Sequence, residues 1–111
     1  MRISVVTISY NQAQFLPACL DSVLAQSHSE VEHIVIDAVS KDGSQEILER
    51  YRPKLAHVII EKDRGPTDGL NKGFGVATGD ILYYLNADDV VLPGAFSDVV
   101  RAYQESPASD V

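Results

Sequence analysis

Near the amino end of the chain stands Ile3-Ser4-Val5-Val6-Thr7-Ile8-Ser9, a run rich in β-branched residues that predicts a strand. The polar residues Tyr10 and Asn11 follow it. Asn11 and Gln14, three positions later, are typical of a capping box, so we expect a helix to open there. That helix is predicted to bury one face, made by Phe15, Leu16, Cys19, Leu20, Val23 and Leu24. The first unit of the fold is therefore a strand followed by a helix.

The same unit recurs along the rest of the chain. Further strands are predicted at 31–37, 57–61 and 81–85, and a helical pattern follows each of them. The segment 81–85 is almost fully apolar, which is typical of a strand that is buried on both faces. We expect Pro107 to end the last helix, and residues 108–111 to approach another strand.

This alternation predicts the α/β class, with three layers in the order α/β/α around a mostly parallel, Rossmann-like sheet. A length of 111 residues indicates one domain, spanning 1–111. Ligands of such sheets bind outside the carboxyl ends of the strands. That rule selects the loops at 9–11, after Asp37, at 62–68 and at 86–89, and we expect the first and last of them to follow central strands.

Composition excludes several classes of protein. Hydrophobic residues make up 45% and charged residues 23% of the chain, as in ordinary globular domains. A formal net charge of −7 argues against nucleic acid as a partner. The single cysteine cannot form an internal disulfide or a thiolate zinc site, which favours a reducing cytosol. No segment approaches the roughly 20 apolar residues of a membrane span.

The most informative segment is Leu85-Asn86-Ala87-Asp88-Asp89, where two adjacent carboxylates follow a predicted buried strand. Like charges at such a place repel each other, and a divalent cation removes that penalty. Mg²⁺ and Mn²⁺ prefer carboxylate and phosphate oxygens, so Asp88 and Asp89 are candidate metal ligands. The alternative is that one of the two acids only caps the following helix.

Other polar residues near the same edge are candidates for nucleotide contacts. Asp37 could accept a hydrogen bond from a ribose hydroxyl or a base, and Tyr10 could stack on a base. Arg64 and Lys72 could meet a diphosphate. The alternatives are a turn-forming aspartate, a half-buried tyrosine and two solvated surface charges.

Five segments, in this order and spacing, resemble the nucleotide-binding half of a family 2 glycosyltransferase with the GT-A fold. They are Val6-Thr7-Ile8-Ser9-Tyr10-Asn11, Val35-Ile36-Asp37 with Ser40-Lys41-Asp42-Gly43-Ser44, Asp68-Gly69-Leu70-Asn71-Lys72-Gly73, Ala77-Thr78-Gly79-Asp80 and Leu85-Asn86-Ala87-Asp88-Asp89. The resemblance implies a transferase that moves a sugar from a nucleoside diphosphate donor to an acceptor hydroxyl with inversion. The acceptor, either a glycan or a lipid-linked sugar, is not identified by it.

The resemblance also implies roles for individual residues. Asp88, with Asp89 beside it, would meet Mn²⁺ or Mg²⁺, which shields the leaving diphosphate. The nucleotide would contact a larger set, namely Ser9, Tyr10, Asn11, Asp37, Arg64, Asp68, Lys72, Asn86 and Ala87. Two features depart from the family pattern: Asn86 stands where the motif often has its first aspartate, and Ala38-Val39 stands where small glycines are common.

In this family the general base and the acceptor-binding surface come from the second half of the fold, so no catalytic base is expected before Val111. We therefore expect a truncated donor-binding portion that has no turnover of its own. An exposed sheet edge would then favour self-association. The expected location is cytoplasmic, with the inner face of the membrane as the alternative.

Three alternatives remain open from the residues. A receiver-like signalling domain has the same alternation, but it needs paired acids after its first strand, where this chain has Ser9-Tyr10-Asn11. A nucleotidyltransferase needs a glycine-rich opening that is absent here. A non-catalytic nucleotide-binding or interaction module could keep the whole pattern.

Overall fold

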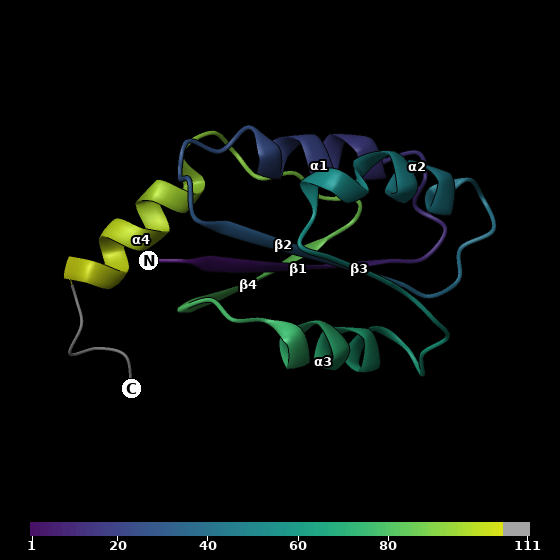
Figure 1. Ribbon diagram of the computed structural model, residues 1–111. Coiled ribbons are helices and arrows are strands. Elements are labelled where there is room, and N and C mark those ends of the chain that lie inside the picture. Colours follow the sequence, from purple (N-terminus) through teal and green to yellow (C-terminus); the bar gives the residue numbers. More distant parts are fainter. Residues whose placement is uncertain (106–111) are drawn as a thin grey trace.

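A computed structural model describes residues 1–105 of the chain (Figure 1). The elements follow in the order β1 (Ile3–Ser9), α1 (Leu16–Leu24), β2 (Val31–Asp37), α2 (Ser44–Tyr51), η1 (Arg52–Lys54), β3 (His57–Ile60), α3 (Pro66–Val76), β4 (Ile81–Asn86) and α4 (Ala95–Glu105). The four strands pair in parallel in the order β3-β2-β1-β4. The predicted α/β class is therefore confirmed. Our expectations for Pro107 and for 108–111 lie outside the described residues.

Helices cover both faces of the sheet, so the three-layer prediction is confirmed. In Figure 1, α1 and α2 lie on one face and α3 lies on the other. Side chains of β1 alternate between the two faces and are buried on both, because Val5 packs with α1 and α4 while Val6 packs with α3. A Cβ atom at Gly73 would overlap the Val6 side chain, so this glycine lets α3 lie close against the sheet.

The expectation that the fourth strand is central and buried on both faces is wrong. β4 pairs only with β1 among the described strands and forms an edge of the sheet. The helix α3 lies over β1 and β2, so Leu82 and Tyr84 on that side of β4 are 53% and 43% exposed. The other side of β4 is covered by α4, where the rings of Tyr83 and Phe96 lie 5.2 Å apart, edge to face.

The predicted capping box is also wrong. The helix α1 begins at Leu16, and its N-cap residue Phe15 makes no side-chain capping bond. Asn11 has a left-handed backbone, with φ of 52°, and its side-chain oxygen accepts a hydrogen bond from the Lys41 amide. Phe15 and Leu24 were expected on the buried face, but they flank it and are largely exposed. Within the described residues, no helix is long and apolar enough to cross a membrane.

Candidate functional site

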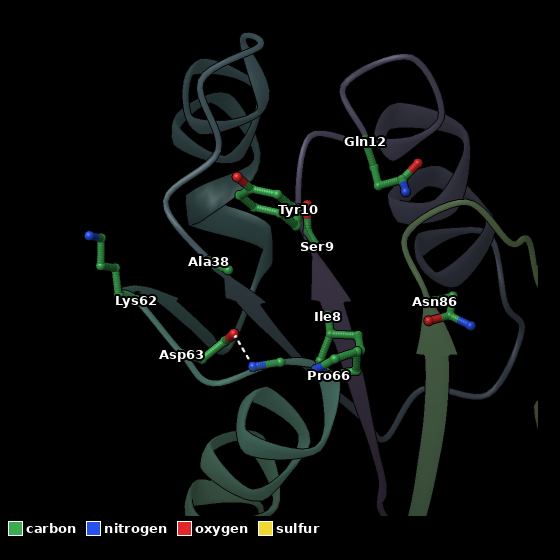
Figure 2. A pocket seen from close by; sticks show the side chains of 10 residues that line it. Ile8, Ser9, Tyr10, Gln12, Ala38, Lys62, Asp63, Pro66 and Asn86 are labelled. Atoms are coloured by element: carbon green, nitrogen blue, oxygen red, sulfur yellow. Dashed lines mark hydrogen bonds between the residues drawn. The ribbon is translucent and has the colours of Figure 1, made fainter.

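A pocket of about 720 Å³ opens at the carboxyl ends of the strands (Figure 2). All four predicted loops contribute to it, since residues after β1, β2 and β3 and the last residue of β4 line its wall. The lining residues are Ile8, Ser9, Tyr10, Gln12, Ala38, Lys62, Asp63, Gly65, Pro66 and Asn86. Ile8 and Ser9, at the end of the central strand β1, line the pocket between the loops that follow β2 and β3 on one side and Asn86 on the other. This is the place expected for ligand sites of open α/β sheets.

The Asp37 side chain lies beneath the pocket wall and is fully buried. One of its oxygens accepts the Ser40 amide at 2.8 Å, and the other accepts the Ser40 hydroxyl at 2.6 Å. The same hydroxyl oxygen accepts a hydrogen bond from the Asn11 amide at 2.8 Å. Asp37 therefore joins the end of β2 to the loops that follow β1 and β2.

A second aspartate strengthens this junction. Asp42 accepts hydrogen bonds from the Ser44 hydroxyl at 2.6 Å and from the Ala13 amide at 2.9 Å. These bonds, the one from Ser44 first, hold the pKa of Asp42 below its usual range because they favour the ionised carboxylate. The two loops are thus fixed to each other before any ligand is present.

Backbone strain collects at the same junction. Val39 has a φ of 61°, and Asn11 has a φ of 52°. Asparagine tolerates the left-handed region, whereas a β-branched residue there is an outlier that stores strain. Val39, in the pair where the resemblance implies small glycines, thus has the backbone that glycine favours.

The structure places Lys72 and Asp68 outside the pocket wall, where they hold the β3–α3 loop. The Lys72 ammonium lies 3.0 Å from Glu61 and 3.6 Å from Asp68, and it donates to the Lys62 carbonyl at 2.8 Å. The hydrogen bond to Glu61 is the main cause of the raised pKa of Lys72. Asp68 accepts the amide of Arg64, whose own side chain is exposed.

Four residues of the loop 62–68 line the pocket although none of them was predicted as a site residue, namely Lys62, Asp63, Gly65 and Pro66. Lys62 and Asp63 both contribute to the wall (Figure 2). They lie within the loop 62–68 that the carboxyl-end rule selected, so the rule found the segment but not the side chains. Gln12, on the opposite side of β1, lies one residue beyond the selected loop 9–11 and was not predicted.

The acid pair follows the pocket residue Asn86 after one intervening residue, Ala87. Ala87 is buried, whereas Asp88 and Asp89 are exposed. The amide of Asp89 donates to the Asn86 carbonyl at 3.0 Å, which turns the chain after β4. Because α4 begins only at Ala95, the alternative that either acid caps this helix is wrong.

Asp88 and Asp89 suit a hard divalent cation that takes its other ligands from a substrate and from water. Among residues 1–105, no three His, Cys, Asp or Glu side chains are grouped to hold a metal by themselves. Mg²⁺ and Mn²⁺ are commonly held by one or two carboxylates together with substrate phosphates and water. Asp88 and Asp89 supply such oxygens two and three residues after Asn86, which lines the pocket. Burial together with the Asp88 charge raises the pKa of Tyr84.

Residues 4–111 match the family described as glycosyl transferase family 2, and the chain belongs to this family. An uncharacterized glycosyltransferase of Nostoc sp. is 36% identical over 109 residues, which make up 96% of this chain and 34% of that relative. The receiver-like and nucleotidyltransferase alternatives thereby lose their support.

Solved structures confirm the GT-A type of fold. TarS of S. aureus, crystallised with UDP-GlcNAc, matches 96% of this chain and 32% of its own with a TM-score of 0.88 and 27% identity. A mannosyltransferase of Pyrobaculum calidifontis, solved with GDP-Man and Mn²⁺, matches 92% of this chain and 32% of its own with a TM-score of 0.84 and 27% identity. The chain spans about a third of the length of these relatives.

Proposed function

We propose that the pocket binds the nucleoside diphosphate part of a sugar donor, and that the chain supplies this site to an inverting glycosyltransferase. The observation that carries the proposal is the position of Asn86, which lines the pocket and is followed within three residues by both acids of the pair. Two relatives with the same fold were solved with UDP-GlcNAc and with GDP-Man and Mn²⁺, which supports it.

In this proposal the residues of the chain have separate tasks. Tyr10 flanks the base, and Asp88 and Asp89 hold the cation at the other end of the pocket. A bound Mn²⁺ or Mg²⁺ would neutralise charge that develops on the departing diphosphate. Asn86 is a neutral amide at a position where an aspartate would add a third negative charge. The proposed cation site therefore depends more strongly on the Asp88–Asp89 pair.

The loops around the pocket reduce the cost of ordering the donor. The bonds from Ser40 to Asp37 and from the Asn11 amide to Ser40 fix the β1 side, and Lys72 fixes the β3 side. A preformed wall loses little conformational entropy when a ligand binds. Asp37 and Lys72 contribute in this way even where their polar atoms do not face the ligand.

The remaining parts of the proposal concern the whole protein. We assign no residue of this chain the role of general base, and we expect no sugar transfer by the 111 residues alone. The acceptor, a glycan or a lipid-linked sugar, and a cytoplasmic site at the inner membrane face also remain proposals.

The bare side of β4, with Leu82 and Tyr84, is expected to favour self-association.

Calorimetry of the chain with UDP, GDP and dTDP, each with and without Mn²⁺, tests the donor site. We expect at least one of them to bind in the presence of Mn²⁺ and to bind more weakly when the ion is removed. Absence of binding to all three would contradict the proposal and favour a non-catalytic interaction module.

A further inference from the structure

The pocket has two chemically different ends (Figure 2). Asn86, which precedes the acid pair in the sequence, marks one end, while Tyr10, Ala38 and Asp63 lie on the far side of β1. If the cation and the diphosphate occupy the acidic end, the nucleoside lies at the end near Asp63. This step rests on the function proposed above.

Asp63 presents a fixed carboxylate at that nucleoside end. Its Oδ1 accepts the Gly65 amide at 2.9 Å, shown by the dashed line in Figure 2. Within residues 1–105, its Oδ2 accepts no hydrogen bond. A Cβ atom on Gly69 would lie 3.1 Å from this oxygen. The absence of a side chain at Gly69 therefore leaves space for the carboxylate.

The loop that carries Asp63 is held from both sides. Lys72 donates to the carbonyl of Lys62, the residue just before Asp63. Asp68 accepts the amide of Arg64, the residue just after it. The Oδ2 atom is therefore a hydrogen-bond acceptor in a fixed place, whereas the oxygens of buried Asp37 are both engaged by Ser40.

We propose that Asp63 reads the base of the donor by accepting a hydrogen bond from its ring N–H. Uracil, thymine and guanine carry such an N–H, whereas the ring nitrogens of cytosine and adenine at that position are acceptors that face the carboxylate unfavourably. The neighbouring wall, made by Ile8, Ala38 and Pro66, is apolar and suits a flat ring. Selectivity follows because a buried polar group that is left unpaired is costly.

Calorimetry with Mn²⁺ and five probes tests this role: UDP, 2′-deoxy-UDP, GDP, CDP and ADP. We expect the unaltered chain to bind UDP or GDP at least about tenfold more tightly than CDP or ADP. Asp63→Asn retains the acceptor for the Gly65 amide. Its affinity for the preferred nucleotide should fall roughly tenfold. Its affinity for CDP and ADP should be unchanged or higher, because the amide NH2 that replaces Oδ2 can donate to their ring acceptors.

Gly69→Ala gives a second variant, since its Cβ would lie 3.1 Å from Asp63 Oδ2 and 3.3 Å from an Ile8 methyl group and would push the carboxylate aside slightly. Gly75→Ala in the same helix is its control, because no atom lies within 4 Å of that Cβ. We expect a reduced preference for UDP or GDP over CDP in Gly69→Ala, and an unchanged preference in Gly75→Ala. An unchanged preference in both Asp63→Asn and Gly69→Ala would overturn the proposal.

Two other outcomes would also overturn it. An equal loss for all nucleotides in Asp63→Asn would make the residue structural or a diphosphate contact. A loss confined to UDP and absent with 2′-deoxy-UDP would place it against the ribose. If the unaltered chain binds none of the probes, the proposed function fails and the role of Asp63 fails with it.

Discussion

Ser40 donates two hydrogen bonds to the buried carboxylate of Asp37, from its amide at 2.8 Å and from its hydroxyl at 2.6 Å. The sequence places Asp37 at the base or ribose of a nucleotide, and that contact stays a prediction. The structure gives the residue a second role, because the Ser40 hydroxyl also accepts the Asn11 amide. One carboxylate thus fixes the relative position of the two loops that line the β1 side of the pocket.

We expect Ser40→Ala to lower the free energy of unfolding by about 2–3 kcal/mol, since it removes a buried hydrogen bond to the Asp37 carboxylate and a part-buried one from the Asn11 amide. Urea titration of both proteins at one pH measures the change. Ser97→Ala is the matched control, because Ser97 shares only one exposed hydroxyl contact, with Ser27. Equal losses in the two variants would show that the Asp37–Ser40 junction contributes no special stability.

We expect Val39→Gly to raise stability by roughly 1 kcal/mol, because it relieves a β-branched residue at a φ of 61°. Ala38→Gly, at a neighbouring position without a positive φ, should lower stability by about 0.5–1 kcal/mol. Thermal unfolding of the two variants beside the unaltered chain checks the difference in sign. A destabilised Val39→Gly would mean that the packing of the valine outweighs its strain.

Burial lowers the pKa of His33 to about 4, and its Nε2 lies 2.8 Å from the Thr7 hydroxyl. Above the ordinary pKa of about 6.5 the imidazole is neutral in the folded and the unfolded chain alike, and stability is unaffected. As the pH falls from about 6.5 towards 4, only the unfolded chain takes up the proton, so stability is lost by up to about 3 kcal/mol.

Unfolding free energies measured between these two pH values in the unaltered chain and in His33→Gln isolate this contribution. We expect a shallower pH dependence in His33→Gln, and an unaltered dependence in His57→Gln, whose residue is exposed at the start of β3. All three proteins carry the same carboxylates. Identical slopes in the unaltered chain and in His33→Gln would contradict the predicted role of His33.

The bare side of β4 leads to a prediction about self-association. We expect the chain to associate with increasing concentration, and Leu82→Lys to weaken this, because it puts a charge on the exposed side of an edge strand. Sedimentation velocity over a wide range of concentration measures it. Leu24→Lys, on the exposed part of α1, should leave association unchanged. A monomer at all concentrations would refute the prediction.

Hydrophobic periodicity was sufficient to predict the order of strands and helices, and β2 was predicted with the bounds that the structure has. Periodicity was not sufficient to place β4, because an apolar run looks the same in a central strand and in an edge strand that lacks a covering helix on one face. Leu82 and Tyr84 are exposed for that reason. The capping box predicted at Asn11 was wrong for a different reason, since asparagine is common both at helix caps and in left-handed backbone.

The candidate site was also predicted only in part, because its loops were predicted and most of its side chains were not. The rule for parallel sheets selected the loops that line the pocket, because it depends only on strand direction. The direction of individual side chains depends on tertiary contacts that no local pattern contains. Lys72 bonds to Glu61 and to the Lys62 carbonyl, and neighbouring Asp63 lines the pocket although no motif singled it out.

The central claim is that Asp88 and Asp89 hold a cation together with a nucleoside diphosphate. Electron paramagnetic resonance of Mn²⁺ tests it most directly, by titrating the chain into Mn²⁺ with UDP or GDP present. We predict a change in the Mn²⁺ signal that needs both nucleotide and protein and that is lost in Asp88→Ala. The change should persist in Asp98→Ala, a control at an exposed position of α4. An identical signal for the unaltered chain and Asp88→Ala would contradict the account.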